Sequence, residues 1–312
     1  MKKFNEKVIP KHLQIETING VCTSRCTMCN IDKWTRKPYC MTNEEFKAII
    51  HKFVPYVEHL EFLSLFGCGE PLLDKELPGK IAIARKLGFH GIGFATNCTE
   101  LDEKMSLRLI KSGLNTIICS IDGIKKETHE AIRRKTNFER IVQNVKGFTN
   151  IRNDISGGTR ILIRFIRQEL NREEWPAFHA EWVNHINPEK GDDVIRFDVH
   201  NCGGDLGDGE EMDHRNEETP SDLVCSDIVE RFFVYSNGDV GFCCADSNGF
   251  FGLGNIIKDD PVEIYNNDIF SKYRRFMKAG RIQELPHCNR CTIMQSQMTK
   301  SNPKKKHAVE IN

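Results

Sequence analysis

The sequence predicts an α/β fold made of parallel strands, followed by a second and smaller module. Six segments with a strand pattern alternate with helical segments, which is typical of parallel strands joined by right-handed crossovers. The most distinctive residue clusters come directly after strands, and the composition changes after residue 201. Periodicity alone leaves open whether the strands form an open doubly wound sheet or a partial barrel. In both folds the chemistry lies at the carboxyl ends of the strands.

The first strand pattern alternates Leu13, Ile15 and Thr17 and leads directly into a cysteine-rich loop. The six predicted strands are residues 12–20, 59–67, 89–97, 114–123, 159–166 and 193–201. The first predicted helix begins at Thr42, which forms a capping box with Glu45. The later predicted helices are residues 75–87, 101–113, 125–135, 138–152 and 173–186.

After the sixth strand the composition divides the rest of the chain. The expected parts are an α/β domain (1–204), a linker rich in glycine and acidic residues (205–222), a small module (223–295) and a basic tail (296–312). Within the module, Asn237-Gly238 between apolar runs predicts a β-hairpin. Residues 262–279 are predicted to form a helix after it.

Composition limits the function classes. The chain has 312 residues, with 44 Lys and Arg against 44 Asp and Glu, so its net charge gives no argument for nucleic acid or membrane binding. The N-terminal segment lacks the apolar stretch of a signal peptide, and no apolar run is long enough to span a membrane. We therefore expect a cytoplasmic protein. Thirteen cysteines in a reducing compartment favour metal or redox chemistry over disulfides.

Cys22, Cys26 and Cys29 lie in one short loop with C-x3-C-x2-C spacing. Three thiolates can hold an iron–sulfur cluster, but a four-iron cluster then keeps one iron without a protein ligand. An open metal position is where a substrate or cofactor can bind. The alternatives are a zinc site, which usually pairs two C-x2-C halves, or three unrelated thiols.

Cys225, Cys243, Cys288 and Cys291 form a second candidate metal set within the module. Their spacing suits either a structural zinc site or a fully ligated [4Fe–4S] cluster, and it does not decide between the two. Cys244 is the alternative ligand to Cys243. Adjacent residues of a hairpin face opposite sides, so only one of the two can face the metal.

The first cysteine loop resembles the signature of the radical S-adenosylmethionine (SAM) superfamily. This resemblance implies a partial (β/α)6 TIM-like barrel in which Cys22, Cys26 and Cys29 bind a [4Fe–4S] cluster. It also implies that SAM binds the open iron and that reduction releases a 5′-deoxyadenosyl radical. Met28 is expected to pack against the adenine of SAM, with ordinary apolar packing as the alternative.

Further segments resemble SAM-binding motifs of the same superfamily. The segment GCGEP (67–71) is similar to its GGEP motif, which implies that Gly69 lets the backbone approach SAM and that Glu70 accepts from the SAM ammonium. The remaining SAM contacts implied by the resemblance are Asn97, Ser120, Asp122 and Arg164. The alternative for each of these is a cap or turn residue.

The second cysteine set resembles the shortened SPASM module called twitch, which carries one auxiliary [4Fe–4S] cluster. The resemblance favours this cluster over zinc, and the G-x4-C spacing from Gly238 favours Cys243 over Cys244. The resemblance to the radical SAM superfamily extends over nearly the whole chain, up to Cys291.

We expect a radical SAM oxidoreductase that dehydrogenates a secondary alcohol of a sugar or cyclitol, with the auxiliary cluster as electron acceptor. One alternative is an epimerase in which Cys68 or Cys202, at predicted strand ends, donates a hydrogen atom. The same residues are also compatible with a ribosomal-peptide maturase, or with a zinc-bearing interaction module without catalysis. The expected partners are a small-molecule substrate and an electron donor such as flavodoxin or ferredoxin.

Overall fold

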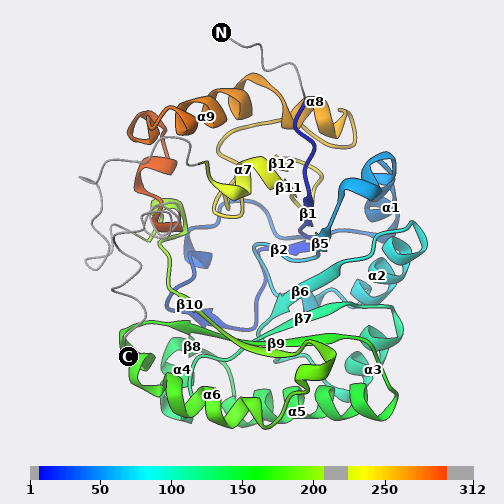
Figure 1. Cartoon of the computed structure of the whole chain (residues 1–312), viewed down its shortest axis with the longest axis vertical. Helices are drawn as coiled ribbons and strands as arrows, with labels where there is room; N and C mark the ends of the chain where they lie inside the picture. The colour runs from blue at the N-terminus through cyan, green and yellow to red at the C-terminus, as the bar shows by residue number, and fades with distance from the viewer. Residues whose placement is uncertain (1–6, 207–223, 294–312) are drawn as a thin grey trace.

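The computed structural model describes residues 7–206 and 224–293 (Figure 1). The predicted basic tail and nearly all of the predicted linker lie outside the described residues. None of the described helices is long and apolar enough to cross a membrane.

One large sheet organises the described chain. Its strand order is β10-β9-β7-β6-β5-β1-β11-β12. The strands are β1 (His12–Ile15), β5 (Phe62–Ser64), β6 (Ile92–Thr96), β7 (Thr116–Ser120), β9 (Arg160–Arg167), β10 (Asp193–Asp198), β11 (Arg231–Val234) and β12 (Val240–Gly241). All neighbouring strands pair in parallel except β11 and β12, which form an antiparallel hairpin.

The strand order answers the question that periodicity left open. From β1 to β10 each strand of the large sheet lies beside the one before it, without the reversal of order that a doubly wound sheet requires. Successive right-handed crossovers then place every helix on the same face, so the sheet curls as a barrel does. The sheet does not close, because β10 and β12 are its two ends. The predicted partial barrel is confirmed.

The helices of the barrel cover the outer face of the sheet (Figure 1). They are α1 (Asn43–His51), α2 (Leu77–Lys86), α3 (Glu103–Lys111), α4 (Lys126–Ile132), α5 (Phe138–Asp154) and α6 (Trp175–Val183). Outward side chains of the strands are fully buried beneath them, as Ile161, Ile163 and Phe165 of β9 show. The predicted capping box starts α1, since Thr42 Oγ1 accepts from the Glu45 backbone and the Glu45 carboxylate accepts from the Thr42 backbone.

The predicted first strand is shorter than its sequence pattern. The chain leaves the large sheet after Ile15, and β2 (Ile18–Asn19) pairs instead with β4 (Tyr39–Cys40). A second small ribbon is formed by β3 (Arg25–Cys26) and β8 (Arg133–Arg134). These two ribbons lie at the carboxyl end of β1 and frame the first cysteine loop.

The C-terminal module is joined to the barrel through the sheet itself. Its described helices are α7 (Ser226–Glu230), α8 (Pro261–Tyr265) and α9 (Asp268–Lys278). Strand β11 pairs in parallel with β1, so the predicted hairpin extends the barrel sheet. The single helix predicted over 262–279 is two helices, because Asn267 begins a new one by accepting from the Phe270 backbone N–H.

Candidate functional site

The first cysteine loop lies where the carboxyl ends of the parallel strands meet. Cys22, Cys26 and Cys29 are each half-buried, and Cys26 is part of the β3–β8 ribbon. The backbone N–H of Cys29 donates to the Cys26 carbonyl at 3.2 Å, which folds the loop back on itself. The three thiols therefore face one region at the edge of the barrel.

Several hydrogen-bond donors point at these sulfur atoms. The backbone N–H of Ser24 lies 3.4 Å from Cys22 Sγ, and its hydroxyl lies 3.3 Å from Cys22 Sγ and 3.5 Å from Cys26 Sγ. Asn97 Nδ2 donates to Cys22 Sγ at 3.6 Å, and Arg133 Nη1 to Cys26 Sγ at 3.7 Å. Donors around the sulfur atoms stabilise thiolates and set the potential of a cluster that they bind. The chemistry of this donor set fits a [4Fe–4S] cluster.

Burial affects the pKa of two of these cysteines, Cys22 and Cys29. It raises the pKa of Cys22 and raises that of Cys29 to about 12. Without a bound cation these thiols therefore stay protonated at neutral pH. Cluster binding must displace the protons, so we expect it to release protons and to weaken in acid.

Glu70 joins two loops of the site. Its carboxylate accepts from the Thr96 hydroxyl at 2.6 Å, from the Asn97 backbone at 2.9 Å and from the Leu72 backbone at 3.1 Å. Burial raises its pKa, while the Asn97, Thr96 and Leu72 donors act in the opposite direction. Three of the roughly four lone-pair positions of the Glu70 carboxylate thus accept hydrogen bonds within the chain. Its predicted contact with SAM would use the remaining position.

Gly69 packs closely against the loop before the first cysteine set, and its predicted approach to SAM stays a prediction. A Cβ atom at this position would lie 2.7 Å from the Ile18 carbonyl oxygen and 3.2 Å from that of Val21. The close approach that requires glycine is therefore to the loop before the first cysteine set. Gly69 lets the segment after β5 pack directly against that loop.

Ser120 ends β7, Asp122 follows it by two positions, and Arg164 lies within the neighbouring strand β9. Arg164 Nη2 donates to Ser120 Oγ at 2.8 Å. Asp122 is fully buried, forms an ion pair with Arg133 Nε at 2.7 Å and accepts from the Ile166 backbone at 2.7 Å. Asp122 therefore holds Arg133 against Cys26 from inside the barrel.

Arg164 is the least satisfied of the predicted site residues. Its Nε is buried and has no hydrogen-bond partner among the described residues. Burial, with the neighbouring Arg133 as the second cause, lowers its pKa to about 10. A cation with an unused donor next to a second cation favours an anionic ligand. This orphaned donor fits the carboxylate of SAM.

Met28, Cys68 and Cys202 lie around the same loop. Met28 is half-buried, and its carbonyl oxygen is 3.9 Å from Cys202 Sγ. Cys68 Sγ lies 3.9 Å from the Ser247 carbonyl oxygen, in the module. Burial is the main cause that raises the pKa of Cys68, and it raises that of Cys202 to about 11. Both thiols therefore keep their S–H bond at neutral pH, as a hydrogen-atom donor must.

The second cysteine set is assembled from three segments of the module. Cys225 precedes α7, Cys243 follows β12, and Cys288 and Cys291 flank a single turn in which the Cys291 backbone donates to the Cys288 carbonyl. Burial raises the pKa of Cys243, and the nearby Cys244, Asp227, Cys288 and Cys225 raise it further. Such mutual influence requires the thiols to lie close together.

The thiol of Cys244, the alternative ligand, donates to Asp227 Oδ2 at 3.2 Å. In the described part of the chain, no three Cys, His, Asp or Glu side chains approach closely enough to share a single metal ion.

Sequence reasoning missed the contacts that join the two cysteine sets. Glu16 is fully buried and binds Arg36 with two hydrogen bonds, of 2.7 and 2.8 Å. Arg36 also donates from Nε to the Ser247 carbonyl at 2.7 Å, and its guanidinium lies 4.0 Å from the Tyr235 ring centre. The one available signal for Glu16 was a charged residue within the predicted first strand.

A second contact joins the two cysteine sets more directly. Asn30, the residue after Cys29, donates from Nδ2 to Ser247 Oγ at 2.9 Å. Ser247 follows Cys243 by four positions, so one side-chain hydrogen bond connects the two cysteine loops. The Thr35 backbone adds a further bond to Asn248 at 2.8 Å.

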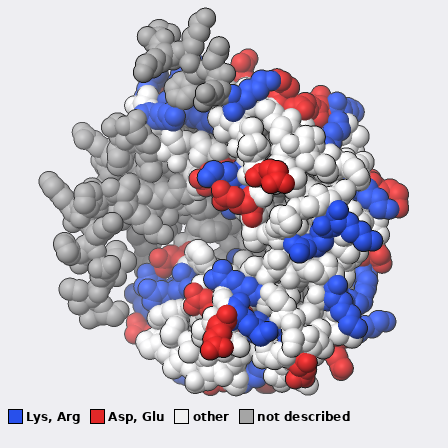
Figure 2. Space-filling model, turned by 45° about the vertical axis from the view of Figure 1, so that its right-hand side comes forward, with Lys and Arg blue, Asp and Glu red and all other residues white. Residues whose placement is uncertain are grey.

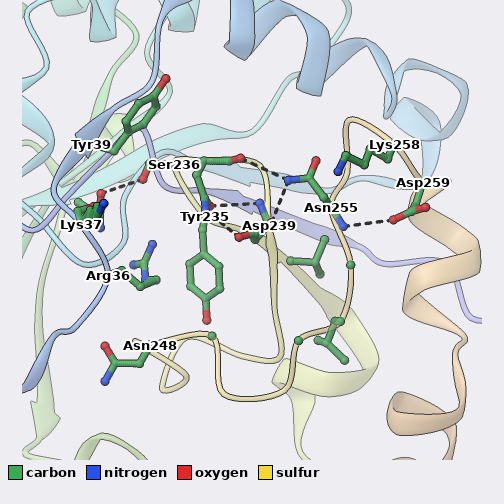
Figure 3. Close-up of a pocket in the computed structure, with 17 residues that line it drawn as sticks. Arg36, Lys37, Tyr39, Tyr235, Ser236, Asp239, Asn248, Asn255, Lys258 and Asp259 are labelled. Atoms are coloured by element: carbon green, nitrogen blue, oxygen red, sulfur yellow. Dashed lines mark hydrogen bonds between the residues drawn. The ribbon is translucent and has the colours of Figure 1, made fainter.

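A cavity of about 710 Å³ lies at the junction of barrel and module (Figure 3). Arg36 and Tyr235 line it on one side, and Asp239, Asn255 and Lys258 line it on the other. None of its lining residues is a cysteine. The cavity is therefore a separate feature from the two cysteine sets. Figure 2 shows Lys, Arg, Asp and Glu mixed over one face of the molecule, in line with the balanced composition.

Two family models match this chain. Residues 17–164 match the radical SAM superfamily, and residues 225–292 match the SPASM family, described as an iron–sulfur cluster-binding domain. Together the two matches contain both cysteine sets and nearly all of the predicted site residues.

Among curated proteins, the chain is similar to a probable GTP 3′,8-cyclase of Saccharolobus islandicus, with 24% identity over 51% of this chain and 48% of that protein. It is 29% identical to a probable GTP 3′,8-cyclase of Methanothermobacter marburgensis, over 42% of each. A third relative is the Fe-coproporphyrin III synthase of Methanosarcina barkeri, 30% identical over 44% of this chain and 32% of that protein. The matches span half or less of these relatives.

Several solved structures share the fold. BtrN in complex with AdoMet and 2-DOIA aligns with a TM-score of 0.61 and 18% identity, over 92% of this chain and 94% of that one. Streptococcus suis SuiB bound to the precursor peptide SuiA aligns with a TM-score of 0.66 and 14% identity, over 92% and 71%. Native anSMEcpe with bound AdoMet aligns with a TM-score of 0.59 and 18% identity, over 90% and 89%.

Proposed function

Residues 17–164 belong to the radical SAM superfamily and residues 225–292 to the SPASM iron–sulfur domains, and on this basis we propose that the enzyme dehydrogenates a secondary alcohol of a sugar or cyclitol. It is a radical SAM enzyme that binds SAM and [4Fe–4S] clusters. In the proposed reaction the carbinol carbon loses a hydrogen atom and the hydroxyl loses a proton. One electron leaves with them, and a ketone remains.

The observation that carries the proposal is the direct connection between the two cysteine sets. The Asn30–Ser247 hydrogen bond and the Arg36–Ser247 contact tie the loop after Cys29 to the loop after Cys243. A dehydrogenation needs an acceptor for the electron left on the substrate, and a cluster bound by the second cysteine set would provide one close to the first set. The end-to-end alignment with the structure of BtrN in complex with AdoMet and 2-DOIA is in line with a small-molecule substrate.

The chain contributes binding and orientation. Cys22, Cys26 and Cys29 would hold the first cluster, and Arg164 with Ser120 would orient the SAM carboxylate. When bound, SAM and the two clusters supply a carbon radical that removes the hydrogen atom and an acceptor for the electron. Cys225, Cys243, Cys288 and Cys291 would hold the second cluster. Flavodoxin or ferredoxin is the expected electron donor.

The test is anaerobic reconstitution followed by product analysis with polyols and sugar nucleotides. We expect about eight irons per chain, four for each cluster. We also expect a ketone and 5′-deoxyadenosine in equal amounts. In the matched variant Cys288→Ala, about half of the iron should remain and SAM cleavage should continue without ketone. Zinc in the second site of the wild-type protein would rule out the proposal.

The positions of Cys68 and Cys202 favour a second candidate, an epimerase. Both are buried thiols beside the first cysteine loop, and burial keeps them protonated. An epimerase would incorporate one deuterium from D2O into its product, and Cys202→Ala or Cys68→Ala would stop this incorporation. Unchanged turnover in both variants would exclude these thiols as donors.

A further inference from the structure

The outer face of the β3–β8 ribbon carries basic side chains that the site described above does not use. In this ribbon Cys26 pairs with Arg133, and Arg25 pairs with Arg134. Successive side chains of a strand point to opposite faces. Cys26 and the buried Arg133 therefore share the inner face, whereas Arg25 and the exposed Arg134 share the outer face.

We propose that Arg25, Arg134 and Lys135 form the docking surface for an acidic one-electron carrier protein that reduces the first cluster. The inference deepens the proposed function, because a radical SAM enzyme requires a reduced cluster. The surface lies directly behind the strand that contains Cys26, and the ribbon is a single layer thick. Since even two packed sheets lie only about 10 Å apart, a carrier seated here comes close to the cluster.

The charges of this surface are available to a partner. Arg134 Nε donates to the Arg25 carbonyl at 3.1 Å, the one contact shown for its side chain among the described residues. Arg25 donates to the carbonyl oxygens of Cys22 and Ser24 at 3.1 and 2.9 Å, and its ion pair with the exposed Asp32 is long, at 3.9 Å. Neither guanidinium is therefore closely paired with a carboxylate in the described part of the chain.

A third cation, Lys135, comes directly after the ribbon. It follows Arg134 directly, is exposed, and has a positive φ of 66°. Redox encounters bury small areas and depend on charge complementarity for their association rates. Arg25, Arg134 and Lys135 are complementary in charge to a carrier protein whose cofactor is surrounded by carboxylates. The whole chain has equal numbers of acidic and basic residues, so only a local group of cations would attract such a carrier.

The test measures cluster reduction by absorbance in stopped flow, with flavodoxin hydroquinone as the reductant. Arg134→Glu is expected to lower the second-order rate constant about tenfold at low ionic strength and to flatten its salt dependence. Lys104→Glu, the same charge change on the exposed surface of α3, is the matched control and should change the rate less than about twofold. Arg25 is left unchanged because it also holds the cysteine loop.

The same variants are then reduced with dithionite at about 0.5 M salt, where screening removes the effect of one surface charge. Equal dithionite rates in wild type and Arg134→Glu, together with the loss with flavodoxin, support the docking surface. An unchanged rate with flavodoxin overturns the inference. An equal loss with both reductants also overturns it, since the variant then disturbs the cluster. Failure of SAM cleavage in dithionite-reduced wild type would instead contradict the radical SAM function.

Discussion

At the scale of single residues, the site is held by buried charges that pair across distant parts of the sequence. Glu16 contacts Arg36, the Cys68 backbone and the Ser236 backbone, and so connects three loops around the end of β1. Asp122 does the same for Arg133, which contacts Cys26. Both carboxylates are fully buried. Replacing either carboxylate removes several contacts at once. It also leaves the partner arginine buried without its counter-charge, which destabilises the fold.

Glu16→Gln tests the first of these pairs. The amide keeps the shape but leaves the Arg36 guanidinium without its carboxylate, and we expect a loss of about 3 kcal/mol in the free energy of unfolding. Chemical denaturation under anaerobic conditions measures it. Glu284→Gln is the control, since its ion pair with Arg281 is exposed and should contribute nothing measurable. Equal stability of the two variants would show that the Glu16 pair does not hold the loops together.

A second prediction at this scale concerns pH. Burial, and next the charge of Arg231, lower the pKa of His12 from 6.5 to about 3. Between these two pKa values the unfolded chain binds a proton at His12 and the folded chain does not. The stability of the fold is therefore free of this penalty only above pH 6.5. Between pH 6.5 and 3 this histidine should cost about 1.4 kcal/mol per pH unit.

His12→Gln should therefore lose less stability than the wild type between pH 7.5 and 5.5, when both are unfolded by denaturant. The expected difference is about 1 kcal/mol. His51→Gln, at an exposed position, serves as the control and should follow the wild-type slope. Identical slopes for wild type and His12→Gln would contradict the lowered pKa.

At the scale of secondary structure elements, the features predicted best from the sequence were those determined by local interactions. The Thr42–Glu45 capping box, the Asn237-Gly238 turn and the cysteine loop depend on residues close in the chain, and the structure contains all three features. The Arg36–Glu16 and Arg133–Asp122 pairs could not be predicted, because partners far apart in sequence meet only after the barrel forms. The packing of Gly69 against the loop before the first cysteine set could not be predicted for the same reason, since its close neighbour is another loop.

The start of α1 gives a test at this scale. Thr42→Ala removes the side chain that accepts from the Glu45 backbone, and the unfolding free energy should fall by about 1 kcal/mol. Thr35→Ala is the control, because only its backbone makes a contact that the structure shows, and it should change stability by less than about 0.5 kcal/mol. A cap that contributes nothing would leave the two variants alike in denaturation.

At the scale of the whole molecule, the module and the barrel share one sheet. β11 occupies the free edge of β1, and Phe232 packs edge-on against Phe53 with ring centres 5.3 Å apart. The boundary predicted near residue 205 therefore marks a change of composition, while the sheet continues across it. An isolated barrel would expose the edge of β1 and an apolar surface.

Truncation tests this arrangement. A chain ending at residue 204 should aggregate, because it lacks β11 and the aromatic residues that cover Phe53. Size-exclusion chromatography and the soluble fraction after expression measure the outcome. A chain ending at residue 293, which keeps every described residue from 7 onward, should remain monodisperse. A soluble, compact barrel fragment would mean that the shared sheet is dispensable.

The pairing of β1 with β11 also has a consequence for biosynthesis. His12 pairs with Arg231, so 219 positions (231 − 12) separate the two partners. At about 5–20 residues per second, the ribosome needs roughly 10–45 s to supply the second partner after the first. During that interval the nascent chain already contains Cys22, Cys26 and Cys29. The module, whose Ser247 later contacts the first cysteine loop, has not yet been translated. A cluster inserted during this period would enter a fold that still lacks the module. A cluster inserted after release from the ribosome would have to enter the completed fold.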